Sequence, residues 1–494
     1  MAKSALVVGA GFSGLTTAAL LAKQGIQVTV LEKNSSVGGR ARLWKHDGFT
    51  FDMGPSWYLM PEVFERFFGL FGRRVSDFYQ LSELDPYYRV FFNPGEFVDI
   101  NSDFQNTKRV FDSFEPGGGA KLDTYMDLAR YKYKVAMEQF LYREYTSIFQ
   151  FFNRKMMQEG LRLNVLDRMD RFVSRYFEDR RAKQLLEYAM VFLGTSPEKA
   201  PALYSIMSHV DIDLGVHYPI GGLGTVAQAF AKLAEEQGVT IRTDADVTSI
   251  RTKNGKVEGV EVGNEFYSAD TVVFTGDYPY AEMELLDASS RSFTSRYWNS
   301  RTLSPSMFLM YLGLNRKLHN FKHHTLYFEE DWTRHFNTIF NAPEWPLDPC
   351  FYVSVISKTD PYTAPEGGEN VFVLVPVAPG MRDTDEQREE YAEHVLDHIT
   401  RITGEDLRVE QRVQRIFSHR DFPSDYHAYK GTALSLAHTL FQTAVFRPPH
   451  SSKKVEGLYY TGHYTHPGVG VPMTLISSEI VAEVIKNKTA SSSA

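Results

Sequence analysis

Cysteine is almost absent from this chain of 494 residues, which contains only Cys350. A single cysteine excludes an intramolecular disulfide, a redox-active dithiol and a zinc site built from thiolates. Such sparse use of cysteine is typical of proteins from reducing compartments, so we expect a cytoplasmic location.

An excess of basic residues is also lacking. The chain has 61 aspartates and glutamates against 53 lysines and arginines, which gives a formal net charge of −8. Proteins bind nucleic-acid phosphates through basic surfaces, so we expect no nucleic-acid partner.

Long charge-free runs are scarce as well. Residues 4–22 are long enough to span a membrane, but three glycines interrupt them directly after the apolar run 6–8. A second strand-forming run, residues 27–31, follows. The order of strand, glycine turn, helix and strand indicates a folded unit rather than a membrane span or an export signal. We expect any membrane contact to be peripheral, because no other run reaches membrane length.

The three glycines form the pattern Gly9-x-Gly11-x-x-Gly14. In a nucleotide-binding β-α-β unit these positions provide a tight turn, a backbone that approaches the diphosphate, and close contact between helix and sheet. The helix that begins near Gly11 directs free N–H groups toward the phosphates. Glu32 stands 18 residues after Gly14, at the end of the second strand, where a carboxylate accepts hydrogen bonds from both ribose hydroxyls.

The residues beyond Glu32 favour FAD over NAD. Gly39, Arg40 and Arg42 lie in one short run that offers a second contact to a longer anionic cofactor. A glycine turn at residues 54–56 then allows the backbone to approach a ring.

The last glycine-rich segment, residues 458–473, leads into a final helix that we expect to end near Ile485. The positive end of this helix can stabilise negative charge at the N1/O2 edge of a reduced flavin. The sequence has no second Gly-x-Gly-x-x-Gly after a strand and no Cys-x-x-Cys, so we expect neither a bound NAD(P)H donor nor a disulfide reductase. Oxygen or a quinone is the expected electron acceptor.

These patterns predict an α/β protein with a Rossmann-like FAD-binding domain, a mixed-sheet substrate domain and a helical, membrane-facing insertion. The predicted parts are residues 1–80, 219–290 and 450–488 for the FAD-binding domain, 81–115 and 291–449 for the substrate domain, and 116–218 for the insertion. A hairpin turn is predicted at residues 253–256, a charged helix at 384–400 and a disordered tail at 489–494.

Six segments spread along the chain match one known family. They are GAGFSGL (9–15), the run from Glu32 to GGRA (32–41), GFTFDMGPSW (48–57), PIGGLG (219–224), HHT (323–325) and THPGVGVP (465–472). The sequence thereby resembles the bacterial phytoene-desaturase-type carotenoid desaturases, including the hydroxycarotenoid 3,4-desaturases, within the FAD-dependent amine oxidase group. The resemblance implies FAD as cofactor, a lipid-dissolved carotenoid as substrate, and double-bond formation by hydride transfer to flavin N5.

The resemblance and the motifs together imply a set of cofactor contacts. They are Gly9, Gly11, Ser13, Gly14, Glu32, Lys33, Gly39, Arg40, Arg42, Gly54, Pro55, Ser56, Val247, Gly462, Pro472 and Met473. His463 and Tyr464 depart from the family, which commonly has small residues after this glycine. The substrate therefore stays open among phytoene, carotenes and 1-hydroxycarotenoids.

No catalytic base or metal site is predicted. Loss of a hydride from an allylic carbon leaves a stabilised cation that sheds a neighbouring proton, so a strong protein base is not required. The titratable cluster at residues 208–217 is therefore interpreted as an ordinary loop. His394 and His398 have zinc-protease spacing, but the residue after His394 is Val395 rather than glutamate.

Residues 145–183 interleave basic and aromatic side chains in a pattern typical of an amphipathic helix. The residues are Arg154, Lys155, Arg162, Arg168, Arg171, Arg175, Arg180 and Arg181 with Phe149, Phe151, Phe152, Met156, Met157, Phe172 and Phe177. Packing against the protein body is the favoured interpretation, and contact with an anionic membrane is the alternative.

Two other functions stay open at this point. The first is a flavin amine oxidase with a polar substrate, which requires a small pocket with polar anchors. The second is a non-enzymatic prenyl-lipid carrier of similar fold, which requires no flavin chemistry.

Overall fold

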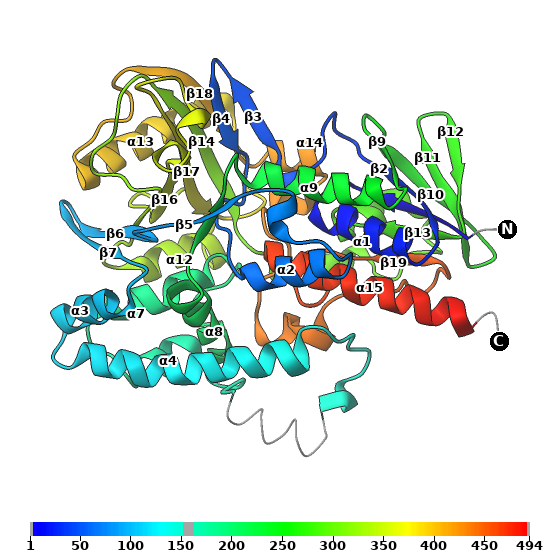
Figure 1. Ribbon diagram of the computed structural model, residues 1–494, viewed down its shortest axis with the longest axis horizontal. Helices are drawn as coiled ribbons and strands as arrows, with labels where there is room; N and C mark the ends of the chain where they lie inside the picture. Colours follow the sequence, from blue (N-terminus) through cyan, green and yellow to red (C-terminus); the bar gives the residue numbers. More distant parts are fainter. Residues whose placement is uncertain (1–2, 152–162, 492–494) are drawn as a thin grey trace.

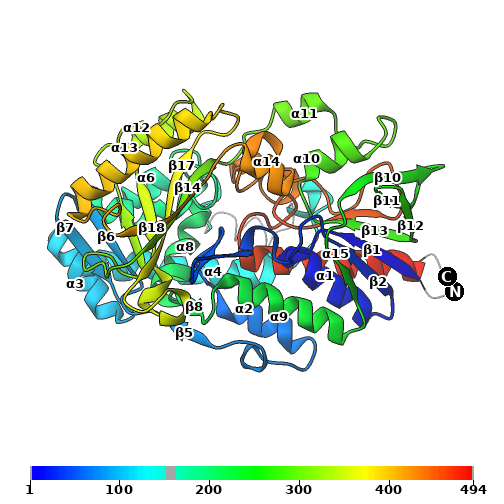
Figure 2. The same ribbon diagram turned by 90° about the horizontal axis from the view of Figure 1, so that it is seen from above.

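A computed structural model describes residues 3–151 and 163–491 (Figure 1). Two large sheets lie toward opposite ends of the molecule, and further helices lie below them in the view of Figure 1 (Figures 1 and 2). The predicted α/β class is confirmed.

The first sheet is parallel and has five strands. In order across the sheet they are β19 (Leu458–Tyr460), β13 (Thr271–Phe274), β1 (Ser4–Val8), β2 (Gln27–Leu31) and β9 (Thr240–Arg242). Val7 of the central strand pairs with Val30 on one side and Val273 on the other. All three side chains are fully buried, as expected for a parallel sheet covered on both faces.

Helices cover one face of this sheet and a small sheet covers the other. The helices are α1 (Phe12–Lys23), α2 (Pro61–Gly69), α9 (Leu223–Glu236) and α15 (Val471–Ser491), which lie together in Figure 1. The small sheet consists of β10 (Val247–Lys253), β11 (Lys256–Val262) and β12 (Glu265–Ser268). The hairpin turn predicted between β10 and β11 is confirmed, and Asn254 and Gly255 adopt the positive φ values, 51° and 75°, that such a turn requires.

The second sheet is mixed and has seven strands. In order they are β18 (Gln411–Phe417), β14 (Ser306–Leu314), β17 (Glu369–Val377), β16 (Phe351–Ser354), β15 (His324–Tyr327), β6 (Tyr88–Asn93) and β7 (Glu96–Ile100). Alternate residues of β14 and β17 belong to different cores, because successive side chains of a strand point to opposite faces. Leu309 and Leu374 face the middle of the molecule, whereas Met310 and Val373 pack beside helix α13.

Helix α13 (Asp385–Thr403) confirms the charged helix predicted from residue 384 onward. Thr384 and Gln387 form a capping box that fixes its start.

The remaining strands form two short pairs, β3 (Leu43–His46) with β4 (Phe49–Asp52) and β5 (Leu81–Glu83) with β8 (His217–Pro219). The remaining helices of the two sheet-bearing regions are α10 (Tyr278–Tyr280), α11 (Ser295–Asn299), α12 (Trp332–Phe340) and α14 (Asp421–Tyr426).

A helical segment follows β7, as predicted. Its helices among the described residues are α3 (Phe104–Phe114), α4 (Gly118–Val135), α6 (Met169–Val173), α7 (Arg180–Glu187) and α8 (Ile206–Ser208), of which α3 lies before the predicted start at residue 116. The long basic helix considered for residues 145–183 is wrong for the described part, since α6 ends at Val173 and α7 begins at Arg180. Those candidate residues that fall within 152–162 lie outside the described residues.

The break between α6 and α7 has a packing reason. Phe172 and Phe177 are both buried in the core, which confirms that this segment packs against the protein body. Arg175 pairs with Asp167 at 3.0 Å, so its charge is matched within the same segment. Leu166 of the same segment is 84% exposed, whereas Met169 is buried.

The predicted disordered tail is wrong for residues 489–491. Helix α15 continues to Ser491, and Lys488 in its last turn interacts favourably with the helix dipole. Residues 492–494 lie outside the described residues. The domain boundaries given above stay a prediction; the strands of the parallel sheet fall within 1–80, 219–290 and 450–488.

The close approach of α1 to β1 gives the first prediction. A Cβ added at Gly14 would lie 1.9 Å from the carbonyl oxygen of Gly9, which is backbone and cannot give way cheaply. We expect Gly14→Ala to lower the free energy of unfolding by at least about 1–3 kcal/mol, measured by denaturant titration.

Gly69→Ala is the matched control. Gly69 lies in helix α2, is exposed, and a Cβ there meets no atom within 4 Å. The control should be neutral or stabilising by up to about 1 kcal/mol. Equal stability of the two variants would contradict the packing described for α1.

Candidate functional site

One cavity of about 1480 Å³ lies between the two sheets and extends to the helical segment. Its lining comes from the glycine turn after β1, the inner face of β14 and β17, and the loop before α15. Ligand sites in proteins commonly occupy about 300–1,000 Å³, so this cavity has room for more than one small molecule.

The turn after β1 forms one end of the cavity. Gly9 has a φ of 104°, and Gly11, the N-cap of α1, has an extended backbone that leaves its Cα facing open space. Gly39, from the second glycine run, approaches so closely that a Cβ there would lie 3.3 Å from the Cα of Gly11. The two glycine runs therefore meet at the N-terminus of α1, where free N–H groups favour an anion.

Glu32 is held in place beside this turn. The side chain is 5% exposed, its Oε2 accepts the N–H of Ala10 at 2.7 Å, and its Oε1 accepts the N–H of Asn34 at 2.9 Å. Oε1 also accepts a hydrogen bond from Nδ2 of Asn34 at 2.9 Å, whereas Oε2 can accept a further hydrogen bond from a hydroxyl in the cavity.

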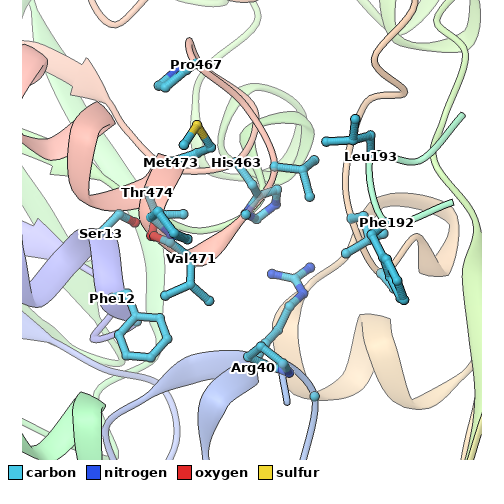
Figure 3. Close-up of a pocket in the computed structure, with 18 of the residues that line it drawn as sticks. Phe12, Ser13, Arg40, Phe192, Leu193, His463, Pro467, Val471, Met473 and Thr474 are labelled. Carbon is cyan, nitrogen blue, oxygen red and sulfur yellow. The ribbon is translucent and has the colours of Figure 1, made fainter. Parts of the chain in front are cut away.

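Arg40 and His463 face the cavity from opposite loops (Figure 3). The Nε and Nη2 atoms of Arg40 are buried and have no hydrogen-bond partner among the described residues. Burial, with help from the Arg40 and Arg447 charges, lowers the pKa of His463 well below its usual value, so the imidazole is neutral. Its Nε2 is also buried without a partner in the described part of the chain.

Unpartnered buried donors of a guanidinium are costly unless a ligand satisfies them. Two buried donors of Arg40 together with the N-terminus of α1 form a site for a diphosphate. The residues present therefore fit a dinucleotide cofactor.

The loop before α15 lines the same end of the cavity as the turn after β1. His463, Pro467 and Val471 line the cavity, and the positive end of α15 begins beside them (Figure 3). Met473 and Thr474, in the first turn of α15, point toward the same space (Figure 3). A helix N-terminus here stabilises negative charge on a bound ring.

Most of the predicted contact residues line the cavity. They are Gly9, Gly11, Ser13, Glu32, Lys33, Gly39, Arg40, Gly54, Pro55, Ser56, Val247, Pro472 and Met473. Three predicted residues do not line it, namely Gly14, Arg42 and Gly462.

Each of these three has another role in the structure. Gly14 lets α1 pack on the turn, and Gly462, with a φ of 109°, lets its loop pass Ser13. Arg42 donates to Asp425 at 2.6 Å and lies over the ring of Tyr426, so it supports the cavity wall from behind. Tyr464, which departs from the family pattern, donates to Asp277 at 2.8 Å rather than entering the cavity.

The opposite end of the cavity is apolar and was not predicted residue by residue. Its side chains include Trp57, Tyr188, Phe192, Leu193, Met207, Met307, Leu309, Tyr352, Phe372 and Leu374. The available indication was the nearly continuous apolar run of β14 and of β17, which predicts strands buried on both faces. Which buried face borders a cavity depends on tertiary contacts.

The HHT segment supports this wall. His324 stacks on Trp57 with ring centroids 4.5 Å apart, and its Nδ1 lies 2.7 Å from the hydroxyl of Tyr352. That hydroxyl lies 2.7 Å from the Oγ of Ser56. Burial lowers the pKa of His324 well below its usual value, so this network is uncharged.

The titratable cluster at residues 208–217 divides into two groups. His209 Nδ1 lies 2.7 Å from the carboxylate of Asp213 outside the cavity lining, and Arg130 pairs with the same carboxylate. Asp211 lines the cavity and is 4% exposed. Burial raises its pKa to about 7, although hydrogen bonds from two tyrosines lower it. Asp211 therefore borders the cavity, and the interpretation of the cluster as non-catalytic stays a prediction.

The described residues show neither a metal-ligating cluster nor a membrane-spanning helix. Residues 3–151 and 163–491 contain no group of three metal-ligating side chains. Over the same residues, no helix combines the length and the apolar character of a membrane span.

Comparison with known proteins gives one consistent family. A family model described as flavin containing amine oxidoreductase matches residues 12–486. A carotenoid 3,4-desaturase of Haloarcula japonica is 46% identical over 481 residues, which cover 97% of each chain. A zeta-carotene-forming phytoene desaturase of Myxococcus xanthus is 33% identical over 485 residues, which cover 97% of this chain and 93% of that one.

Among solved structures, an oxidoreductase of Methanosarcina mazei has a similar fold, with a TM-score of 0.64. The two chains are 17% identical, and the match covers 98% of this chain and 100% of the other. A likeness at this identity shows the fold alone.

The geometry at Gly11 predicts a variant that separates folding from cofactor binding. A Cβ at Gly11 meets no protein atom within 4 Å, but it occupies the space in front of the N-terminus of α1. We expect Gly11→Ala to leave the thermal midpoint of the apoprotein unchanged. The dissociation constant for FAD should rise by about tenfold or more, since about 1.4 kcal/mol of binding free energy corresponds to tenfold.

The midpoint is measured by thermal unfolding and the affinity by quenching of flavin fluorescence. If the Gly11→Ala variant folds normally and binds FAD with unchanged affinity, the diphosphate does not bind at this turn.

Proposed function

The chain belongs to the flavin-containing amine oxidoreductase family, and within it we propose that the protein is an FAD-dependent carotenoid desaturase. One observation carries the proposal: a single cavity joins a site for a diphosphate to a long apolar wall. The 46% identity to a carotenoid 3,4-desaturase over nearly the whole chain supports it.

FAD would be held by residues with separate tasks. The N-terminus of α1 and the free donors of Arg40 bind the diphosphate, and Glu32 accepts ribose hydroxyls. The segment at residues 54–56 and the start of α15 surround the ring. Bound there, FAD supplies a two-electron acceptor for C–H oxidation.

The protein's own contribution to catalysis is to position a hydrocarbon that has no charged groups to bind. A polyene is bound by shape and dispersion, for which the Trp57, Phe192 and Leu374 side chains provide a flat, apolar wall. The same wall excludes water from the reacting carbons, which keeps a cationic intermediate from being hydrated.

The apolar wall also argues against a polar amine as substrate, which requires fixed polar anchors. The unpaired donors of Arg40 argue against a carrier without cofactor, because they would remain unsatisfied. Within the carotenoids, the stronger likeness to a 3,4-desaturase favours a carotenoid modified near its end over phytoene.

The test of this function uses purified protein and carotenoids in liposomes. Phytoene, a carotene and a 1-hydroxycarotenoid are supplied separately, with oxygen or a quinone as acceptor. We expect a yellow protein that dithionite bleaches, and an extract whose absorption moves to longer wavelength with at least one carotenoid. Flavin that stays oxidised under anaerobic conditions with every carotenoid would contradict the proposal.

Membrane contact belongs to the same proposal. Apolar side chains near the cavity are exposed: Leu166, which lines it, is 84% exposed, and Phe441 is 71% exposed next to lining residues Thr443 and Ala444. Phe446 lies beside Phe441, with ring centroids 5.8 Å apart. Exposed apolar residues around a cavity entrance are typical of a lipid-binding surface, so we propose that this rim rests on the cytoplasmic leaflet.

The rim predicts a defined loss of membrane binding. We expect Leu166→Glu combined with Phe441→Glu to reduce vesicle binding by about tenfold or more, since burying each side chain contributes about 1.5–3 kcal/mol. Sedimentation with lipid vesicles measures binding, and flavin content checks the fold.

Tyr362→Glu is the control for this pair. Tyr362 is 92% exposed and lies outside the cavity lining, in a turn that packs near β4. An equal loss of vesicle binding in the control would show that the rim is not the lipid-binding surface.

A further inference from the structure

A buried carboxyl group in the cavity wall has no assigned task. Asp211 lies in a single π-helical turn, His209–Asp213, between α8 and β8. Its Oδ2 accepts hydrogen bonds from the hydroxyls of Tyr88 at 2.7 Å and Tyr188 at 2.8 Å. Its Oδ1 is buried and has no hydrogen-bond partner among the described residues.

Such a half-satisfied carboxyl group destabilises the fold. A buried polar atom without a partner costs about 1–3 kcal/mol, and more when it is charged. The cavity residues Tyr188, Val210 and Met207 donate no hydrogen bond to Oδ1. A costly polar group that borders a ligand cavity is a candidate for function.

The position of Asp211 connects the two ends of the cavity. The rings of Tyr88 and Tyr188 lie 5.4 Å and 6.3 Å from the ring of Trp57, with centroids as reference points. Trp57 directly follows Pro55 and Ser56, the proposed neighbours of the cofactor ring, and itself lines the cavity. Asp211 therefore lies on the cavity wall where the cofactor end meets the apolar end.

Desaturation releases one proton for each double bond. One C–H bond breaks with its electron pair, and this hydride reduces the oxidised flavin by two electrons. A neighbouring C–H bond then loses its proton, and its electron pair becomes the second bond of the new C=C. In a dry apolar cavity that proton requires an acceptor, since water is excluded.

We propose that Asp211 is the catalytic base that accepts this proton on Oδ1, an assignment that rests on the proposed desaturase function. The two tyrosines hold the carboxylate by Oδ2, and Oδ1 is left without a partner among the described residues. The proton passes to solvent after product release, and oxygen or a quinone reoxidises the flavin.

The protonation state agrees with this role. Burial raises the pKa of Asp211 to about 7, so the carboxylate form becomes available as the pH rises through that value. The titratable groups that face it are the phenols of Tyr87, Tyr88 and Tyr188, and burial raises the pKa of each above its usual value. These phenols stay neutral near pH 7, so a pH dependence in this range reports Asp211.

The experiment measures anaerobic flavin reduction by the carotenoid substrate as a function of pH. In the wild type we expect the rate to rise with an apparent pKa of about 7. Asp211→Asn should lower the rate by about 100-fold or more and remove this rise, because general-base catalysis contributes about 10²–10⁴-fold. Asp211→Glu should restore part of the rate together with the pH dependence.

Two further variants separate catalysis from structure. Tyr188→Phe removes one hydrogen bond to the carboxylate and should move the apparent pKa upward. Asp213→Asn changes a carboxylate in the same turn that lies outside the cavity lining, and should leave the pH profile in place.

A second readout does not depend on turnover. The infrared carbonyl band of a protonated carboxyl group, obtained as wild type minus Asp211→Asn in the FAD-bound protein, should disappear as the pH rises through about 7. Absence of such a band would overturn the assignment.

Three further outcomes would each overturn the assignment of Asp211 as the base. Asp211→Asn with the wild-type rate and pH profile would overturn the base and leave the desaturase function standing. A variant that changes only the preference for hydroxylated over non-hydroxylated carotenoids would identify Asp211 as a substrate anchor instead. A wild type that binds FAD but is reduced by no carotenoid would overturn the proposed function and this assignment with it.

Discussion

The meeting of two glycine runs at the N-terminus of α1 is the constraint on which the rest of the site depends. A Cβ added at Gly39 would lie 3.3 Å from the Cα of Gly11, and the next residue, Arg40, has two buried donors without a partner among the described residues. A positive helix end and a guanidinium without partners require an anion. Residues 54–56, the start of α15 and the apolar wall line the same cavity and would surround the ring of an FAD whose diphosphate is held there.

The cavity joins two kinds of surface that proteins usually keep apart. At one end, backbone N–H groups, Glu32 and Arg40 offer hydrogen-bonding groups to a charged molecule. At the other end, the inner faces of β14 and β17 offer only hydrocarbon and aromatic surface. Hydride transfer between a flavin and a hydrocarbon requires this junction, since both reactants must meet in a space without water.

The cofactor end could be predicted from the sequence because its determinants are local. Gly9, Gly11, Gly14 and Glu32 belong to one β-α-β unit, and their spacing fixes their geometry before any tertiary contact forms. The amphipathic helix considered for residues 145–183 is wrong for the described part, where contacts with the core divide the segment into short helices. Arg42 was assigned to the cofactor because its partner, Asp425, lies 383 residues away. The hydrogen bonds of Asp211 could not be predicted for a similar reason, since Tyr88 and Tyr188 come from separate elements.

The central claim is that one cavity holds FAD and a carotenoid in contact. A crystal structure of the purified protein with both molecules tests it most directly. The account predicts a diphosphate bonded by Arg40 and the N-terminus of α1, with the polyene lying along Trp57, Phe192 and Leu374. A carotenoid bound on a surface separate from the flavin, or a diphosphate bound away from Gly11, would contradict it.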